Sequence, residues 1–416
     1  MRQPLHIALV SYEYAGLARG GGIGTYVRNA ARMLADSGHR VEVFTEGAAG
    51  TADLDGVTVH TCPTAARSDF AEAVADAFSE RHRAAPFDVV EAAEYGADAA
   101  RVAEAFPDLP LVVKLHTPAF LISEINYRFE PWTKKVRYLA GGLKRGQLPR
   151  PYWVYRPEGD PERALALRAD EVTSPSRALL DLLRERWSLD PDRLAHVPNV
   201  FIPPPALLDV PAETRTRRVT FIGKLEVRKG VLDLADAVPH VLAAVPEATF
   251  RFIGRSLPHP GTGQDLAVHL RDRLGRAADA VEFVEAVPYD EVPAYYADTD
   301  VCAFPSVWEN FPNVCLEAMT AARGVVASSS GGMPEMVDDG VTGRLVAPGD
   351  ARTLAGAIVD LLRDPDGRAR MGRAARAHAS AAYAPDVIAP LQEASYRRVV
   401  SRSNDAMNAT VDEVDL

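Results

Sequence analysis

Two glutamates, Glu309 and Glu317, stand eight positions apart in the stretch PSVWENFPNVCLEAM. The second falls about one and a half turns into a helix that we expect to begin near Pro312. A loop carboxylate and a helix carboxylate can then face one pocket, and the helix start offers the free N–H groups of Asn313 and Val314. This pattern suits a ligand that carries both hydroxyl groups and an anion. Two exposed glutamates would show the same spacing.

Two lysines, Lys224 and Lys229, flank a short turn in FIGKLEVRKG. We expect this turn to follow a strand and to precede a helix. Two cations at the carboxyl end of a strand can neutralise a diphosphate. An ordinary charged turn is the alternative that the motif alone leaves open.

A glycine-rich segment, ARGGGIGTYV (18–27), lies between the first expected strand and the first expected helix. Glycines there let a backbone N–H, such as that of Gly22, approach an anion at a helix N-terminus. The dinucleotide fingerprint fails, because Val27 or Thr25 stands where its third glycine is required. We therefore expect a phosphate or sugar contact, with a plain tight turn as the alternative.

His116 closes the expected strand LVVKLH, where it can donate to a phosphate or to a sugar hydroxyl. A structural histidine is the alternative. We expect no metal, because no His, Cys, Asp and Glu residues have the spacing of a metal site. The motif Asp298-Thr-Asp300 is interpreted as the end of a helix that leads into a strand.

The elements that position these residues follow one repeated pattern. Short β-branched runs alternate with amphipathic segments from LHIALV (5–10) to LAHVP (194–198), and again from RRVTFIG (217–223) to GRLV (343–346). Strand–helix–strand repeats build parallel sheets. The pattern predicts two doubly wound α/β domains, with ligands at the carboxyl ends of the strands, near the crevice between the domains.

The proline-rich stretch IPPPALLDVPAE (202–213) has no period and predicts an interdomain linker. We expect an N-terminal acceptor-side domain over 1–205 and a C-terminal donor domain over 206–385. A helix at 386–402 completes the N-terminal domain by crossing back to it. The residues that follow, 403–416, are expected to form a flexible acidic tail.

One segment, 119–156, breaks the alternation. It holds eight lysines or arginines against two glutamates, a net charge of +6, and aromatic residues interleave with the cations. An insertion of this length in a compact domain is usually functional or mobile. We interpret it either as a solvated excursion or as a patch for the acceptor or for a membrane surface.

Composition limits the class of protein. The 416 residues are 47% hydrophobic and 25% charged, which excludes wholesale disorder. The formal net charge of −11 argues against nucleic acid as a partner. Three scattered cysteines indicate a reducing cytosol rather than a disulfide framework. No apolar run reaches the ~18 residues of a membrane span, so we expect a cytoplasmic protein.

With these motifs in this order, the sequence resembles the large retaining glycosyltransferase family 4. The resemblance implies the GT-B fold, which is two Rossmann-like domains separated by a cleft. It runs over nearly the whole chain, and the lysine pair followed by Glu-x₇-Glu makes it specific. The segments that carry it are GGIGTYV (21–27), KLHTP (114–118), ADEVTSPS (169–176), VPN (197–199), FIGKLEVRKG (221–230), WENFPNVCLEAM (308–319) and GGMPEMVDDGVTGRLV (331–346).

The resemblance implies a nucleotide-diphosphate sugar of UDP or GDP type as the donor substrate, with no separate cofactor. It assigns Lys224 and Lys229 to the diphosphate. It assigns the backbone N–H at Gly22 to the distal phosphate and Glu317 to the ribose hydroxyls. The family usually has Arg where Lys224 stands, a difference that keeps the charge and removes bidentate geometry.

The remaining implied roles surround the transferred sugar. Glu309 would contact that sugar, and His116 would approach both the sugar and the acceptor. Asn313 and Val314 would present backbone N–H groups, while the backbone of Val287 would read the base edge. The implied catalytic residues are therefore His116, Glu309 and Lys229.

The implied reaction is hexosyl transfer with retention at the anomeric carbon, independent of metal. The motifs do not identify the acceptor, and we expect an envelope glycan, a lipid or a small natural product. Frequent Ala and Arg suggest a bacterial source. The alternatives are a nucleotide-sugar epimerase or hydrolase on the same scaffold, and a non-catalytic nucleotide-sugar-binding protein.

Overall fold

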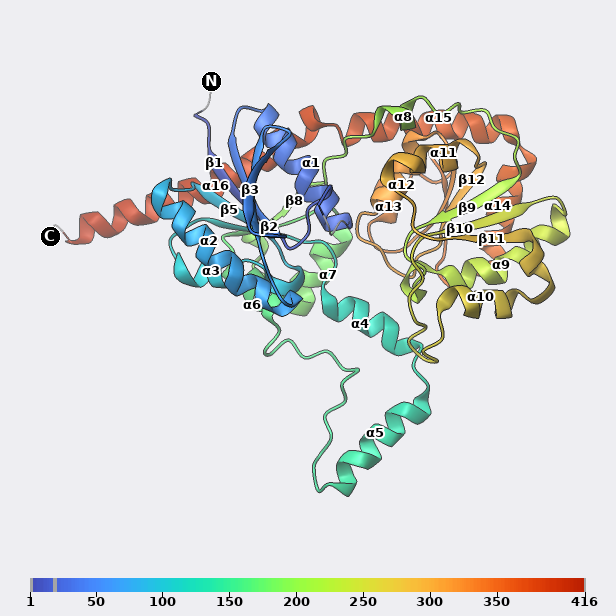
Figure 1. Ribbon diagram of the computed structural model, residues 1–416, viewed down its shortest axis with the longest axis horizontal. Coiled ribbons are helices and arrows are strands. Elements are labelled where there is room, and N and C mark those ends of the chain that lie inside the picture. Colours follow the sequence, from blue (N-terminus) through green and yellow to red (C-terminus); the bar gives the residue numbers. More distant parts are fainter. Residues whose placement is uncertain (1–2, 18–20, 415–416) are drawn as a thin grey trace. The chain divides into compact units, whose positions relative to one another are not determined.

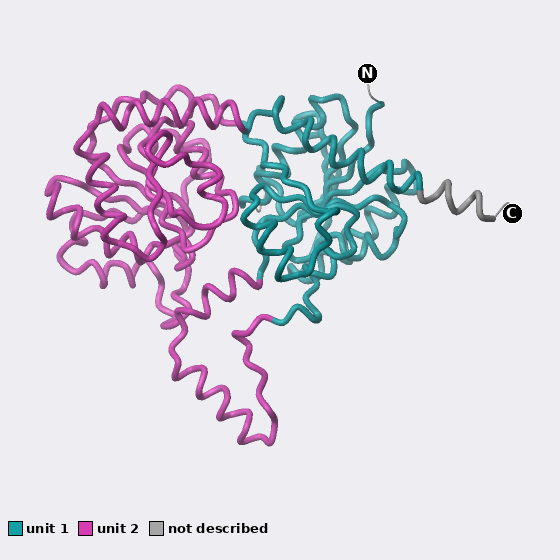
Figure 2. Tube along the Cα trace, turned by 180° about the vertical axis from the view of Figure 1, so that it is seen from behind, with its two compact units in different colours: residues 1–119, 156–202, 383–416 teal, residues 120–155, 203–382 magenta. Residues whose placement is uncertain are grey.

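The computed structural model describes residues 3–17 and 21–414, and side chains up to residue 405. The chain divides into two compact units (Figure 2). Unit 1 comprises 1–119, 156–202 and 383–416, and unit 2 comprises 120–155 and 203–382. Each unit is a sheet with helices on both faces, wholly parallel in unit 2 and parallel except for one edge strand in unit 1 (Figure 1). Short 3₁₀ helices are η1 (Arg67–Asp69), η2 (Tyr95–Ala97), η3 (Pro191–Arg193), η4 (Val227–Lys229), η5 (Gly275–Ala280) and η6 (Tyr289–Glu291).

The sheet of unit 1 has the strand order β3-β4-β2-β1-β5-β6-β7-β8. All neighbouring strands are parallel except β3, which pairs antiparallel with β4. The strands are β1 (His6–Val10), β2 (Arg40–Glu46), β3 (Gly50–Leu54), β4 (Val57–Cys62), β5 (Val89–Ala93), β6 (Leu111–Lys114), β7 (Glu171–Ser174) and β8 (Leu194–His196). The sequence pattern missed β3, because this edge strand is largely exposed and has no apolar face.

The helices of unit 1 are α1 (Gly22–Asp36), α2 (Phe70–Ala84), α3 (Ala100–Ala105), α6 (Pro161–Arg168), α7 (Arg177–Trp187) and α16 (Pro385–Val414). Successive residues of a strand point to opposite faces. Val43 accordingly packs with α1 and α16 residues such as Leu34 and Ile388, whereas the ring of Phe44 lies 5.2 Å from that of Phe78 on α2. Both faces of the sheet are therefore covered.

The helix α16 is longer than expected. The backbone remains helical to Val414, where we expected a helix at 386–402 and a flexible tail at 403–416. No glycine or proline follows Pro390, so nothing in the sequence stops the helix. Buried Glu91 of β5 accepts hydrogen bonds from Tyr396 Oη (2.9 Å) and Gln392 Nε2 (3.0 Å), which fasten α16 to unit 1.

The sheet of unit 2 is wholly parallel, in the order β11-β10-β9-β12-β13-β14. Its strands are β9 (Arg218–Ile222), β10 (Thr249–Ile253), β11 (Val281–Val284), β12 (Val301–Phe304), β13 (Gly324–Ser328) and β14 (Arg344–Val346). Its helices are α4 (Ala119–Arg128), α5 (Trp132–Lys144), α8 (Pro205–Leu208), α9 (Val231–Ala244), α10 (Leu266–Leu274), α11 (Val292–Ala297), α12 (Asn313–Thr320), α13 (Met333–Met336), α14 (Ala351–Arg363) and α15 (Pro365–Ala382).

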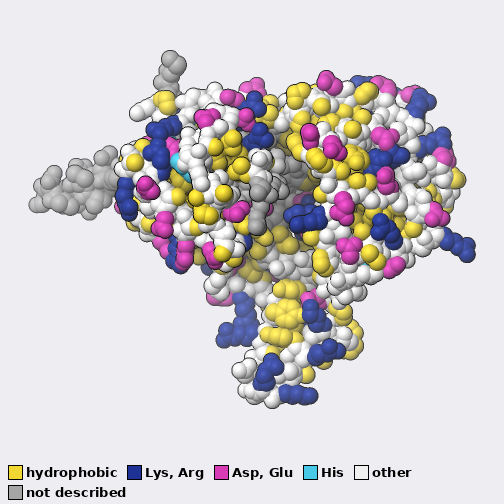
Figure 3. All heavy atoms as spheres, viewed as in Figure 1, with side chains coloured by type: hydrophobic (Ala, Val, Ile, Leu, Met, Phe, Trp, Pro, Cys, Tyr) yellow, Lys and Arg dark blue, Asp and Glu magenta, His cyan; other side chains and the backbone are white. Residues whose placement is uncertain are grey.

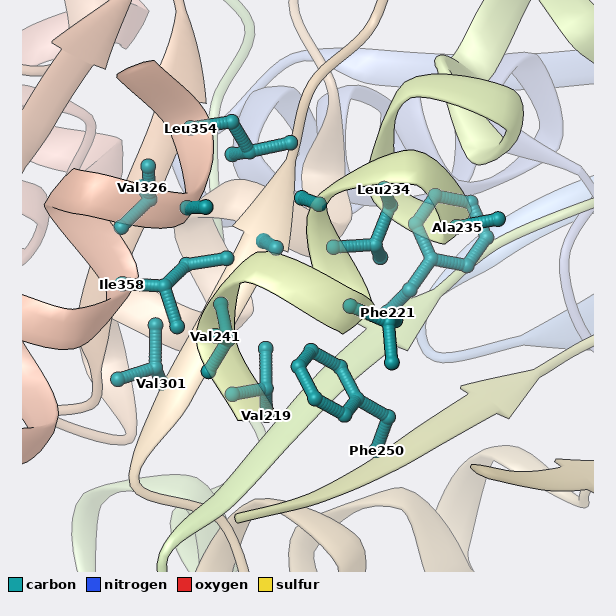
Figure 4. Packing of buried hydrophobic residues seen from close by; sticks show 14 of the residues in the cluster. Val219, Phe221, Leu234, Ala235, Val241, Phe250, Val301, Val326, Leu354 and Ile358 are labelled. Atoms are coloured by element: carbon teal, nitrogen blue, oxygen red, sulfur yellow. The ribbon is translucent and has the colours of Figure 1, made fainter. Parts of the chain in front are cut away.

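The core of unit 2 lies between the sheet and helices α9 and α14 (Figure 4). Val219 and Phe250 of the strands meet Leu234 and Val241 of α9, and Ile358 of α14 completes the layer. The two helices bury one apolar face each. This layer fixes the strands from whose carboxyl ends the loops with the lysine pair and the glutamates emerge.

The division into units differs from the expected domains at one internal segment. Residues 120–155 group with unit 2, whereas we expected them within an N-terminal domain at 1–205. One reason is packing next to α4, where the ring of Phe129 meets that of His259 edge-on at 6.2 Å. The units otherwise divide at 202 and 382, close to the expected 205 and 385.

The proline-rich stretch is not a free linker. It contains α8, and both Leu207 and Val210 are buried. Arg376 Nη2 donates to the carbonyl of Val210 at 2.5 Å, and Arg323 donates to that of Pro211. These contacts attach the stretch to unit 2. In the part of the chain that the structure describes, no helix has the length and apolar character to span a membrane.

Candidate functional site

The candidate residues follow the central strands of the two sheets. In unit 1, β1 lies between β2 and β5, so the chain reverses its direction of winding there. In unit 2, β9 lies between β10 and β12 in the same way. Loops after such strands diverge and leave space for ligands. Gly22 begins α1 after β1, although residues 18–20 of its loop lie outside the described residues. Lys224 and Lys229 follow β9.

The loop after β9 holds its two lysines in different environments. Lys224 is exposed and, within the described part of the chain, forms no ion pair, whereas Lys229 is half-buried. Gly230 ends the turn at φ 70°, and a Cβ there would lie 1.9 Å from the carbonyl oxygen of Pro305. Only glycine fits this close approach. It brings the lysine turn against the loop that contains Glu309.

Glu309 is 5% exposed and sits in the loop after β12. Its Oε1 accepts a hydrogen bond from Arg228 Nη1 at 2.9 Å and contacts the ammonium group of Lys229. Arg228 is itself buried, and its Nη2 donates to Glu226 at 2.7 Å. Two cations and two carboxylates therefore form one compact cluster.

The charges in this cluster control its protonation. Burial raises the pKa of Glu309, but the positive charges of Arg228 and Lys229 outweigh burial and hold it below its usual value. Burial lowers the pKa of Lys229, and the carboxylate of Glu309 acts in the opposite direction. Glu309 is thus an ionised acceptor near neutral pH, suited to orienting hydroxyl groups rather than to donating a proton.

A glycine pair supports the backbone of Glu309. Gly332 N donates to the carbonyl of Glu309 at 2.8 Å. Gly331 has φ 63°, and a Cβ on it would lie 1.9 Å from that same oxygen. Ser330 Oγ also donates to the carbonyl of Val307 at 2.8 Å. The loop after β13 therefore depends on glycine to reach the loop after β12.

Helix α12 begins beside Glu309. Its N-cap is Pro312, which makes no side-chain capping hydrogen bond. The backbone N–H groups of Asn313 and Val314 are therefore the first of the helix and have no partner within it. Glu317 is 5% exposed and accepts a hydrogen bond from Tyr296 Oη at 3.2 Å. Burial raises the pKa of Glu317 to about 7, although its tyrosine partners act to lower it. This carboxyl can take either charge state near neutrality.

His116 lies in unit 1, after β6. Its backbone N–H donates to both oxygens of Glu94, each at 2.8 Å, and Glu94 is fully buried. Its Nδ1 faces two acceptors, the carbonyl of Lys114 at 3.1 Å and Glu94 Oε2 at 3.4 Å. A neutral His116 therefore carries its hydrogen on Nδ1, which makes Nε2 an acceptor.

The structure brings some of the expected residues together and leaves others apart. Lys229 and Glu309 are in contact, although they stand 80 positions apart in the sequence. Val287 is half-buried in the loop after β11. Its expected role, contact with the nucleotide base through its backbone, stays a prediction. Gly22 and His116 belong to unit 1, and the other candidates belong to unit 2.

Three supporting residues were missed by the motif analysis: Arg228, Glu94 and Tyr296. Arg228 immediately precedes Lys229, so the additional cation in this motif could have identified it from the sequence. Glu94 and Tyr296 give no comparable signal, because their partners are 22 and 21 positions away. Among the described residues, no group of three or more His, Cys, Asp or Glu could hold a metal ion.

In each of the two doubly wound units, the loop after the central strand lies where such sheets bind ligands. Two family models match the chain. "Glycosyl transferase 4-like domain" matches residues 21–200, and "Glycosyl transferases group 1" matches residues 216–364.

Relatives and solved structures agree with these matches. A glycogen synthase of Mycobacterium tuberculosis is 28% identical over 407 residues, which covers 89% of each chain. A D-inositol 3-phosphate glycosyltransferase of Stackebrandtia nassauensis is 28% identical and covers 96% of this chain and 94% of its own. Sucrose-phosphate synthase from Thermosynechococcus elongatus superposes with a TM-score of 0.71 at 23% identity, covering 96% of this chain and 100% of its own. The chain therefore belongs to glycosyltransferase family 4 and has the GT-B fold.

Proposed function

We propose that this glycosyltransferase moves a sugar from a nucleotide-diphosphate sugar to an acceptor, with retention at the anomeric carbon and without a metal ion. The observation that carries the proposal is the cluster of Lys229, Glu309 and Arg228 beside the start of α12. Solved GT-B structures of similar fold hold UDP and glucose in an Anabaena protein, and ADP with acarbose in Arabidopsis starch synthase IV.

The leaving diphosphate supplies the electrostatic argument. Negative charge develops on it as the bond to the sugar breaks, in an oxocarbenium-like transition state. Lys224, Lys229 and the first N–H groups of α12 would stabilise that charge, which is the role metal ions play in other enzymes. Loss of one such donor commonly lowers the rate by about 10²–10³.

Glu309 would orient the transferred sugar. Both of its cations bind Oε1, so we assign Oε2 to the sugar hydroxyls. His116 would contact the sugar or the acceptor through Nε2, and Glu317 would accept from the ribose hydroxyls. Gly22 and Val287 keep the roles that the family resemblance implies.

The test of the site is substitution. Lys229→Ala and Glu309→Ala should each lower turnover by at least about a hundredfold, whereas Lys224→Arg, which keeps the charge, should retain most of the activity. Release of nucleoside diphosphate is the measurement, with and without acceptor. Near-normal rates in both alanine variants would refute the site assignment.

The mechanism and the alternatives need separate measurements. NMR of the glycosylated product should show the same anomeric configuration as the donor, and activity should survive EDTA. A hydrolase or epimerase would instead consume the donor at full rate without any acceptor. A non-catalytic binding protein would bind the nucleotide sugar and leave it unchanged. Thermal-shift screening of nucleotide sugars identifies the donor first.

A further inference from the structure

Residues 131–155, which we call the arm, form a distinctive part of unit 2. The arm consists of α5 and the return segment that follows it. It contains six lysines or arginines and no aspartate or glutamate. In a chain whose net charge is −11, this is a local excess of positive charge.

One side of α5 is used to hold the arm together. The ring of Tyr138 meets those of Tyr152 and Trp153 edge-on, at 5.0 and 6.0 Å. Gly142 is buried against Pro149, with no room for a Cβ. Hydrogen bonding adds to this contact, since Tyr138 Oη donates to the carbonyl of Arg150 at 2.9 Å. The return segment therefore covers the tyrosine side of α5.

The apolar stripe of α5 is not covered. Trp132, Val136 and Leu143 are 73%, 51% and 62% exposed. At 3.6 residues per turn these three positions fall within about 40° of one another on the helix. Helices of globular proteins normally turn such a stripe toward a core. Here the stripe faces outward, and Leu148 of the return segment is 90% exposed as well.

The polar side of α5 is basic, and its cations lie roughly 100–160° around the helix from the stripe. Arg137, Lys144 and Arg145 are exposed, and in the described part of the chain no carboxylate pairs with them. Lys134 differs, because it contacts Glu130 at 2.5 Å. The space-filling view shows the result, with apolar side chains on the arm bordered by dark blue ones (Figure 3).

We propose that the arm lies on an anionic lipid surface, with the stripe of Trp132, Val136 and Leu143 in the acyl boundary and Arg137, Lys144 and Arg145 on the headgroups. A helix with an apolar stripe, a tryptophan and a basic polar face binds membranes in this way. A second copy of this chain is a poorer partner for the stripe, because two arms with six cations each would repel one another. This proposal goes beyond the proposed function and does not depend on it.

The experiment is flotation of the full chain with vesicles of phosphatidylcholine alone and of phosphatidylcholine mixed with phosphatidylglycerol. The stripe variant carries Trp132→Ser, Val136→Ser and Leu143→Ser. The charge variant carries Arg137→Gln, Lys144→Gln and Arg145→Gln. A matched control carries Val268→Ser, Val341→Ser and Leu391→Ser, which replace side chains of 45%, 52% and 43% exposure elsewhere.

The wild type and the control should bind the vesicles that contain phosphatidylglycerol and should not bind the vesicles of phosphatidylcholine alone. The stripe and charge variants should each lose binding by roughly tenfold or more. Thermal melting by circular dichroism should be unchanged in all variants, because the replaced side chains are exposed. Equal binding to both vesicle types, or full binding by the stripe variant, overturns the proposal. So does a lipid-free dimer that the stripe variant abolishes, since the occupant is then a second copy.

Discussion

Arg228 Nη1 lies 2.9 Å from Glu309 Oε1, the oxygen that the ammonium group of Lys229 also contacts. Arg228 is buried and is tied at its other nitrogen to Glu226, whereas Lys229 is half-buried. The arginine is therefore the fixed partner of the carboxylate. The lysine is the partner that can also donate to a phosphate, because an ammonium group has three donors.

Replacement of Arg228 by alanine should impair Glu309 without touching substrate. We expect kcat to fall by about ten- to a hundredfold, because a buried carboxylate loses one of its two cations. Removing that positive charge also raises the pKa of Glu309, so the acid limb of the pH–rate profile should move to higher pH. Arg228→Lys should restore part of both effects. An unchanged acid limb in Arg228→Ala would contradict the positioning role, and Arg215→Ala, at an exposed arginine, is the control.

The carboxyl of Glu317 should make stability depend on pH. Burial raises its pKa from 4.5 to about 7, so the folded state keeps a proton that the unfolded state has lost between these values. Stability from this group is therefore present below the lower value and is lost as pH rises through the higher one. Relative to Glu317→Gln, the wild type should lose roughly 2–3 kcal/mol of unfolding free energy between about pH 5 and about pH 8. Urea unfolding of both proteins across this pH range measures the two free energies of unfolding. A difference between the proteins that does not change with pH would refute the prediction.

Nucleotide binding should release a proton through the same group. Ribose hydroxyls that donate to Glu317 favour its ionised form, so binding lowers its pKa. Just below neutral pH, a nucleoside diphosphate should bind with proton release, and Glu317→Gln should abolish that release. Calorimetry in buffers of different ionisation enthalpy counts the protons. The same release from wild type and variant would point to another group.

The glycine behind Glu309 should tolerate no side chain. In Gly331→Ala, the added Cβ would meet the carbonyl of Glu309 at 1.9 Å, so the loop must move. We expect a large loss of activity and destabilisation well above the roughly 1 kcal/mol of left-handed backbone strain alone. Gly340→Ala is the matched control, since Gly340 has φ 78° and an added Cβ there would meet nothing within 4 Å. Equal effects of the two substitutions on activity would mean that the contact with Glu309 is unimportant.

The polar network around Glu91 should stabilise unit 1. Tyr26, Tyr396 and Gln392 all donate to this buried carboxylate. Tyr396→Phe removes one donor and should cost about 1–3 kcal/mol of unfolding free energy. Tyr138→Phe removes a hydrogen bond that is exposed to water, at a tyrosine that is 38% exposed, and should change stability by less than about 0.5 kcal/mol. Chemical denaturation compares the two variants, and equal losses would show that the Glu91 bond is not special.

Much of the fold followed from local patterns. Strands such as β1 and β12 are nearly continuous apolar runs between turn residues, a pattern typical of strands that are covered on both faces. Exposed β3 escaped notice because it lacks such a run. The length of α16 and the attachment of 120–155 to unit 2 were also missed. The attachment of 120–155 depends on distant contacts, which a local period does not encode, whereas α16 continues because no glycine or proline follows Pro390.

The site divides in the same way. The types and spacing of Lys224, Lys229, Glu309 and Glu317 are properties of the chain itself. Together with the other family motifs they indicated the family, and they predict a diphosphate ligand. The sharing of Glu309 Oε1 by Lys229 and Arg228 is a property of the folded unit alone. It arises because β9 and β12 are neighbours in the sheet, which brings together loops that are 80 positions apart. Parallel pairing of distant strands is a non-local choice, so only the tertiary structure decides which charges meet.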